Sequence, residues 1–182
     1  MAKAGDIIES PPIGDRIVFL KTARDTNGAL LQFDDYLKVG GNGPVEHIHT
    51  RQEERLDVIS GIMRAKVGGK EQDYKPGDCA IVPAGVAHQW WNSGSEELHI
   101  RATFVPALRM ERFLETFFGL ARDGKTDSKG NPAFLQIVAS MPYYEIYLPK
   151  PPIALQRALF TLLAPLAKLR GYQPYYPKYS ID

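Results

Sequence analysis

Three of the four histidines in this chain lie in one stretch, residues 41–92, together with a carboxylate. His47 and His49 are two residues apart, so both imidazoles leave the same face if this segment is a β-strand. Glu54 follows closely, and His88 comes from a later segment. Neutral imidazoles with one anionic oxygen are a common ligand set for divalent transition metals. The stretch therefore predicts a metal site built from separate strands.

Glycine, proline and asparagine recur at fixed distances around these residues. The stretch contains two patterns, Gly41-x5-His47-x-His49-x4-Glu54-x6-Gly61 and Gly77-x5-Pro83-x-Gly85-x2-His88-x3-Asn92. Both resemble the two signature motifs of the cupin superfamily, with every signature residue present and about fifteen residues between the motifs.

This resemblance implies a mainly β chain that forms a single double-stranded β-helix, or jelly-roll, barrel. It also implies one divalent transition metal in the barrel mouth, held by His47, His49, Glu54 and His88. Fe(II), Mn(II), Ni(II) or Co(II) would keep two coordination positions open beyond these four ligands, whereas Zn(II) prefers fewer ligands. The resemblance implies no single reaction, because one fold hosts many activities.

The ligand spacing also distinguishes two neighbouring glutamates. Counting by two from Glu54 places Leu56 and Val58 on the same face of a strand that runs to Ser60. A carboxylate at one end of an apolar face suits a metal ligand, so we expect Glu53 to face solvent. Glu54 is also the candidate catalytic residue, as the group that tunes the metal and could move a proton.

The second motif is expected to deliver His88 after a tight corner at residues 83–86. Counting by two from His88 places Trp90 and Asn92 on its face. Trp90 either walls a substrate pocket and excludes water or simply fills the barrel. We expect Asn92 to stabilise a turn rather than to bind metal.

The last predicted strand, residues 98–105, carries His99 and Arg101 on the face opposite its apolar side chains. We therefore expect both outside the barrel interior. His99 is interpreted as structural, and Arg101 as a candidate for binding an anionic substrate.

Alternation and turn residues predict the other strands at 17–20, 30–38, 45–49, 54–60, 62–67 and 74–82. Asn27-Gly28 is a hairpin signal, and residues 68–70 and 75–78 predict two further turns. Residues 1–13 are interpreted as an arm or edge segment.

The apolar period becomes helical after residue 106, and it predicts a helix over 106–122. A short helix is expected from Pro132 to about Ser140, ended by Met141-Pro142, and a last helix over 151–170, interrupted or kinked at Pro165. Residues 143–148 are ambiguous. We expect residues 1–107 to form the barrel with its N-terminal arm. Residues 108–182 would form a helical extension packed on the barrel or on a dimer partner.

Composition narrows the partners and the compartment. With 22 basic and 21 acidic side chains, the chain lacks the basic excess of a nucleic-acid binder. The uncharged run at 158–167 is shorter than the ~20 residues of a membrane span. Cys79, the single cysteine, cannot form an internal disulfide and is interpreted as a packing residue, and no signal core is visible at the start. We expect a cytoplasmic protein and a homodimer.

These observations support two classes of function. The first is a metal-dependent oxidoreductase, resembling cupin dioxygenases, that acts on a small organic acid or an enolisable or phenolic compound, with an isomerase or lyase as a variant. The second is a cupin that binds a small molecule or metal without turnover. The second hypothesis stays open because no acid or base beyond the ligands can be placed from the sequence.

Overall fold

The computed structural model describes residues 2–180. Met1, at the start of the expected arm, and residues 181–182, at the end of the expected extension, lie outside the described residues. The strands are β1 (Ile7–Ser10), β2 (Asp15–Lys21), β3 (Leu31–Leu37), β4 (Ile48–His49), β5 (Glu53–Ser60), β6 (Met63–Val67), β7 (Lys70–Tyr74), β8 (Cys79–Val82), β9 (His88–Asn92), β10 (Leu98–Val105) and β11 (Ile146–Tyr147).

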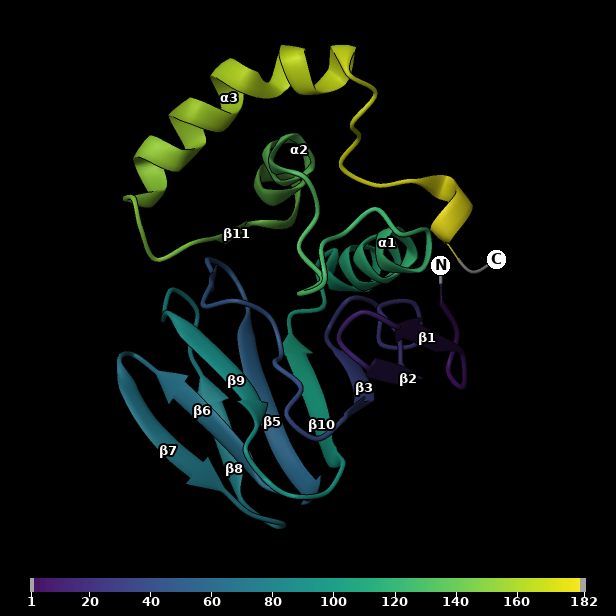
Figure 1. Cartoon of the computed structure of the whole chain (residues 1–182), viewed down its shortest axis with the longest axis vertical. Helices are drawn as coiled ribbons and strands as arrows, with labels where there is room; N and C mark the ends of the chain where they lie inside the picture. Colours follow the sequence, from purple (N-terminus) through teal and green to yellow (C-terminus); the bar gives the residue numbers. More distant parts are fainter. Residues whose placement is uncertain (1, 181–182) are drawn as a thin grey trace.

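The strands form antiparallel sheets rolled around one core (Figure 1). One sheet has the order β1-β2-β3-β10-β5-β8, a second has the order β7-β6-β9, and β11 pairs with β4. Figure 1 shows the first two sheets packed against each other. This arrangement confirms the predicted mainly β, jelly-roll architecture.

Period-two alternation explains which side chains enter the core. In β5, Glu54, Leu56 and Val58 are buried while Glu53 and Arg55 are exposed. In β9, the buried residues are His88, Trp90 and Asn92. The Asn92 side chain donates from Nδ2 to the carbonyls of Leu37, Lys38 and Glu96, which confirms its predicted turn-stabilising role.

Steric constraints explain why the first motif has a glycine at position 61. Gly61 turns the chain between β5 and β6 with φ +81°, a conformation that disfavours other residues. A Cβ atom there would lie 2.9 Å from the carbonyl oxygen of Glu97. The motif spacing therefore marks a turn that only glycine fits.

The sequence did not predict β7. The expected strand at 74–82 is β8, which begins only at Cys79, after the predicted turn at 75–78; β7 lies before that turn, on the edge of the smaller sheet. Most of β7 is exposed and polar, so it lacks the alternation from which the other strands were predicted. Its pairing with β6 is what holds it extended.

The helices are α1 (Met110–Arg122), α2 (Phe134–Tyr144) and α3 (Ile153–Leu169), followed by a 3₁₀ turn, η1 (Pro177–Tyr179). Within residues 2–180, none of the helices has the length and apolar character that crossing a bilayer requires.

The prediction that Met141-Pro142 ends the second helix was wrong. α2 continues through Pro142, because the buried Tyr144 packs edge-on against Phe113 with ring centroids 5.3 Å apart. The helix ends instead at Glu145, which has a left-handed φ of +59° and donates its N–H to the carbonyl of Met141. α3 also continues past Pro165 without interruption.

The three helices lie over one end of the barrel (Figure 1). Leu114 and Phe118 of α1 share a core with Phe33 and Phe104 of the large sheet. Because β11 pairs with β4, the extension also adds a strand to the segment that carries His49. The helical region and the barrel therefore form one packed unit.

Candidate metal centre

Three separate segments bring the predicted ligands together. His49 lies in β4, Glu54 in β5 and His88 at the start of β9. His47, just before β4, forms an antiparallel bridge with His88, in which each N–H donates to the other residue's carbonyl at 2.9 Å. This backbone bridge holds two of the imidazoles side by side.

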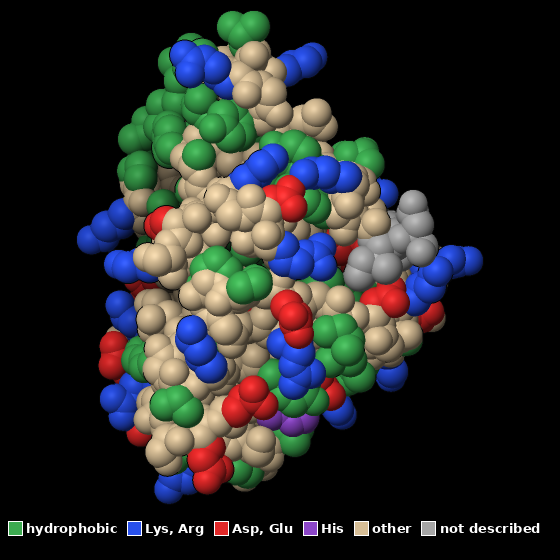
Figure 2. Space-filling view, turned by 45° about the vertical axis from the view of Figure 1, so that its right-hand side comes forward, with side chains coloured by type: hydrophobic (Ala, Val, Ile, Leu, Met, Phe, Trp, Pro, Cys, Tyr) green, Lys and Arg blue, Asp and Glu red, His purple; other side chains and the backbone are tan. Residues whose placement is uncertain are grey.

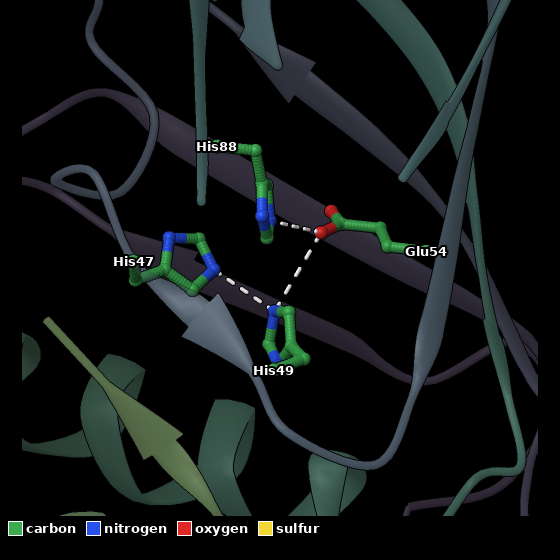
Figure 3. A group of neighbouring side chains, drawn as sticks. All are labelled: His47, His49, Glu54 and His88. Carbon is green, nitrogen blue, oxygen red and sulfur yellow. Dashed lines mark hydrogen bonds and ion pairs between the residues drawn. The ribbon is translucent and has the colours of Figure 1, made fainter. Parts of the chain in front are cut away.

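The four side chains point toward a common centre (Figure 3). Each offers one ligand atom, and these atoms all lie within 4.8 Å of one another. Nε2 of His47 is 2.9 Å from Nε2 of His49, and Oε2 of Glu54 is 2.6 Å from Nε2 of His88 and 3.6 Å from Nε2 of His49. All four residues are buried.

Backbone carbonyls orient two of the imidazoles. Nδ1 of His47 lies 2.9 Å from the carbonyl oxygen of Val45, and Nδ1 of His88 lies 3.1 Å from that of Val86. A carbonyl can only accept, so the neutral rings carry their proton on Nδ1 and present the Nε2 lone pair to the centre. His88 Nε2 and Glu54 Oε2 then face each other as two acceptors, an arrangement that calls for a cation or a proton between them.

The protonation states also suit a metal ligand set. Burial lowers the pKa of His47 well below its usual range, and it lowers that of His49 to about 4. Burial alone would raise the pKa of Glu54, but the three histidines outweigh it and bring the value down to about 2. His88 is the exception, because the Glu54 carboxylate overcomes burial and raises its pKa.

The residues present therefore fit a divalent transition metal. The donor set is three imidazole nitrogens and one carboxylate oxygen, which converge on one centre. Glu53 is exposed, as predicted, and takes no part.

The cluster opens into a cavity of about 220 Å³ between the barrel and the helices. The barrel contributes Phe33, Trp90 and Phe104, and the extension contributes Phe113, Phe117, Phe118, Met141, Ile146 and Phe160. Trp90 is 4% exposed, and its indole N–H has no hydrogen-bond partner among the residues that the structure describes. The wall of this cavity is thus largely aromatic.

Arg101 does not reach this cavity. It lies on the outer face of β10, as the alternation predicted, and its Nε donates to Asp34 Oδ1 at 2.9 Å. His99 lies on the same face, with its ring 4.2 Å from that of Tyr36. Arg101 is therefore not brought together with the four ligands, and its assignment as a substrate-binding residue stays a prediction.

Two carboxylates that the sequence analysis missed do reach the cavity. Asp15 of β2 and Asp35 of β3 both line it. Burial raises the pKa of Asp15 to about 6, although its hydrogen bond with Asp35 acts in the other direction. Burial also raises the pKa of Asp35 well above its usual range, helped by the charges of Asp15 and Glu54. The available signal was the alternation Leu31, Phe33, Asp35, Leu37, which places an acid on a buried face.

Comparisons with known proteins agree with this description. Residues 35–105 match the family model of the cupin domain. A probable oxidoreductase from Hypocrea virens, virH, is 29% identical over 156 residues, which cover 79% of this chain and 70% of that protein.

Solved structures also align with this chain. KdgF from a Halomonas species is 18% identical and aligns over 56% of this chain and 86% of its own, with a TM-score of 0.49. An RmlC-like cupin from Shewanella frigidimarina is 25% identical over 55% and 83%, with a TM-score of 0.48.

A rolled pair of antiparallel sheets with a His₃Glu cluster at one end defines a β-barrel protein with a candidate metal centre. Residues 35–105 of this chain form a domain of the cupin family.

Proposed function

We propose that this cupin is a metal-dependent oxidoreductase, dioxygenase-like in reaction class, that acts on a small enolisable or phenolic compound. The observation that carries the proposal is the opening of the His₃Glu cluster into a cavity with aromatic walls. The name of the Hypocrea virens relative supports the oxidoreductase class.

The cavity favours a neutral aromatic or enolic compound over a small organic acid. Among its lining residues Lys129 is the one lysine or arginine, and it is exposed to solvent. Asp15 and Asp35 add acidic groups to the same wall. A carboxylate ligand would find no buried lysine or arginine among the lining residues, whereas aromatic walls stabilise a flat apolar ligand.

Each site residue has a role in this proposal. His47, His49, Glu54 and His88 would hold the ion, which supplies Lewis acidity and, if redox-active, one-electron chemistry. Glu54 places a negative charge at the ion and thereby tunes it. Trp90 walls the cavity and helps to exclude water from the ligand.

We also propose that two copies of the chain pair through α3. Five leucines of this helix, with spacings that alternate between four and three residues, remain exposed: Leu155, Leu159, Leu162, Leu166 and Leu169. Figure 2 shows hydrophobic side chains gathered in the upper part of the molecule, where Figure 1 draws α3. This spacing is that of a coiled-coil seam, which a second copy of the same helix complements.

The compartment proposed is the cytoplasm. The single cysteine, Cys79, is free, in keeping with a reducing environment.

Metal content tests the first part of the proposal. Protein purified without added metal should contain close to one transition-metal ion per chain by elemental analysis. His88→Ala should lose most of this ion, because it removes one of four ligands, whereas His99→Ala should keep it, because His99 lies on the outer face. Equal metal content in the two variants would refute the site.

Oxygen uptake tests the reaction class. Protein reconstituted with Fe(II) should consume oxygen with members of a panel of phenols, catechols and enolisable ketones. No uptake and no product with Fe(II), Mn(II), Ni(II) or Co(II) would favour a cupin that only binds its ligand.

A further inference from the structure

Asp15 and Asp35 form a pair of buried acids beside the metal ligands. In the β2–β3 ladder Asp15 lies opposite Leu37, and Ile17 lies opposite Asp35. The two acids are therefore diagonal neighbours on the inward face, and their side chains are hydrogen-bonded to each other. Asp15 is 8% exposed and Asp35 is 4% exposed.

Two carboxylates this close cannot both be charged without a large cost, so they share a proton. The directions of their pKa shifts assign it: the mutual hydrogen bond lowers the pKa of Asp15 and raises that of Asp35. Asp35 is thus the protonated donor and Asp15 the ionised acceptor.

Each acid keeps one oxygen without a partner. Oδ1 of Asp15 and Oδ1 of Asp35 are buried, and neither has a hydrogen-bond partner within residues 2–180. Buried polar atoms are rarely left in this state, because each costs about 1–3 kcal/mol. Since both residues line the cavity, a ligand that enters it can satisfy these atoms.

We propose that the Asp15–Asp35 pair is a binding site for the hydroxyl group of an aromatic or enolic ligand in the cavity. The unpartnered Asp15 oxygen accepts a hydrogen bond from that hydroxyl, and the aromatic walls hold the ring. The pair selects a neutral O–H donor and rejects a carboxylate. The inference deepens the proposed function, since it specifies how that substrate class is recognised.

Binding of two matched probes to metal-free protein tests this site. 2-Naphthol and 2-methoxynaphthalene share one ring system, but only the first carries a hydroxyl donor. In a fluorescence titration, we expect 2-naphthol to bind about tenfold more tightly than 2-methoxynaphthalene. This ratio corresponds to about one charge-assisted hydrogen bond. Equal affinities, or no binding of 2-naphthol, would overturn the proposal.

Three variants assign the preference to the pair. Asp15→Asn should remove most of the tenfold preference without weakening 2-methoxynaphthalene, because an amide oxygen is a weaker acceptor. Asp35→Asn keeps a hydrogen-bond donor toward Asp15 and should retain most of the preference for 2-naphthol. Asp34→Asn is the matched control, since Asp34 faces outward and pairs with Arg101. A preference that survives in Asp15→Asn would also overturn the proposal.

Metal content and oxygen uptake are measured on the same preparations. A protein that shows no uptake but prefers 2-naphthol would contradict the proposed oxidoreductase and keep the hydroxyl site. Oxygen uptake without a preference for 2-naphthol would support the oxidoreductase and contradict the hydroxyl site.

Discussion

Ile146 of the C-terminal extension pairs in antiparallel register with His49 of the metal cluster. Beside this pair, the N–H of Thr50, which follows His49, donates to the carbonyl of Glu145, which precedes Ile146, at 3.1 Å. A segment far along the chain is therefore a direct neighbour of a ligand strand. The helical extension completes the site as well as covering it.

We expect Ile146→Asp to destabilise the whole molecule. Ile146 is 4% exposed and lines the cavity, so the substitution buries a charge with no basic partner at the junction of barrel and helices. Such changes cost about 3–5 kcal/mol. Thermal unfolding should show one transition at a lower temperature, and metal content should fall with it.

Leu148→Asp is the matched control, because Leu148 is two residues away and 43% exposed. It should change stability by less than about 1 kcal/mol. If Ile146→Asp lowered the melting temperature of the helices alone, in a separate transition, the extension would not be part of the barrel's cooperative unit.

The buried acids should make stability fall as pH rises. The folded state holds the Asp15 pKa at about 6, above its ordinary value of 3.8, so folding favours the protonated form. The resulting decrease in the free energy of unfolding is absent below about pH 4, grows between about pH 4 and 6, and is complete above this range. Asp15→Asn should therefore be more stable than the wild type at pH 7, by up to about 2 kcal/mol, and should lose this advantage at pH 4.

The ionisable groups that face this pair in the cavity are His47, His49, Glu54, Lys129 and Tyr147. Denaturant unfolding of wild-type and Asp15→Asn protein from pH 4 to pH 7 measures the difference. Asp34→Asn should show no gain at pH 7. A difference between Asp15→Asn and wild type that is constant with pH would contradict the raised pKa of Asp15.

Charges on α3 should separate the proposed dimer. Leu162 and Leu169 are 75% and 83% exposed, so replacing both with glutamate removes apolar surface from the seam without disturbing the core. Light scattering should give the mass of two chains for the wild type and of one chain for the double variant. Melting temperatures should stay close when compared at low protein concentration.

Ile81→Glu is the control for this experiment, because Ile81 is 51% exposed but lies on β8, away from the helices. It should leave the mass unchanged. A wild type that is monomeric at high concentration would refute the dimer, and a double variant that stays dimeric would place the interface elsewhere.

The sequence was most informative where structure depends on local spacing. The strand period of two predicted the inward positions of Glu54, Trp90 and Asn92, and the motif spacing brought His88 to the same cluster as His47. These patterns are readable because neighbouring residues in a strand alternate between faces whatever the strand pairs with.

Prediction failed where a neighbour from another part of the chain decides the conformation. β7 is extended because β6 pairs with it. α2 continues past Pro142 because the buried Tyr144 packs against Phe113. Neither fact is visible in local composition, which is polar in the first case and contains a helix breaker in the second.

By itself, then, the sequence predicted the barrel and the four candidate ligands, since the resemblance of its two spaced motifs to the cupin signature motifs implies both. Only the tertiary structure decided the character of the cavity. The register of β2 against β3 joins Asp15 to Asp35, and the pairing of Ile146 with His49 draws the aromatic side chains of the helices over the cluster. The physical reason is that register and packing are set by the burial of many side chains at once, not by any short segment.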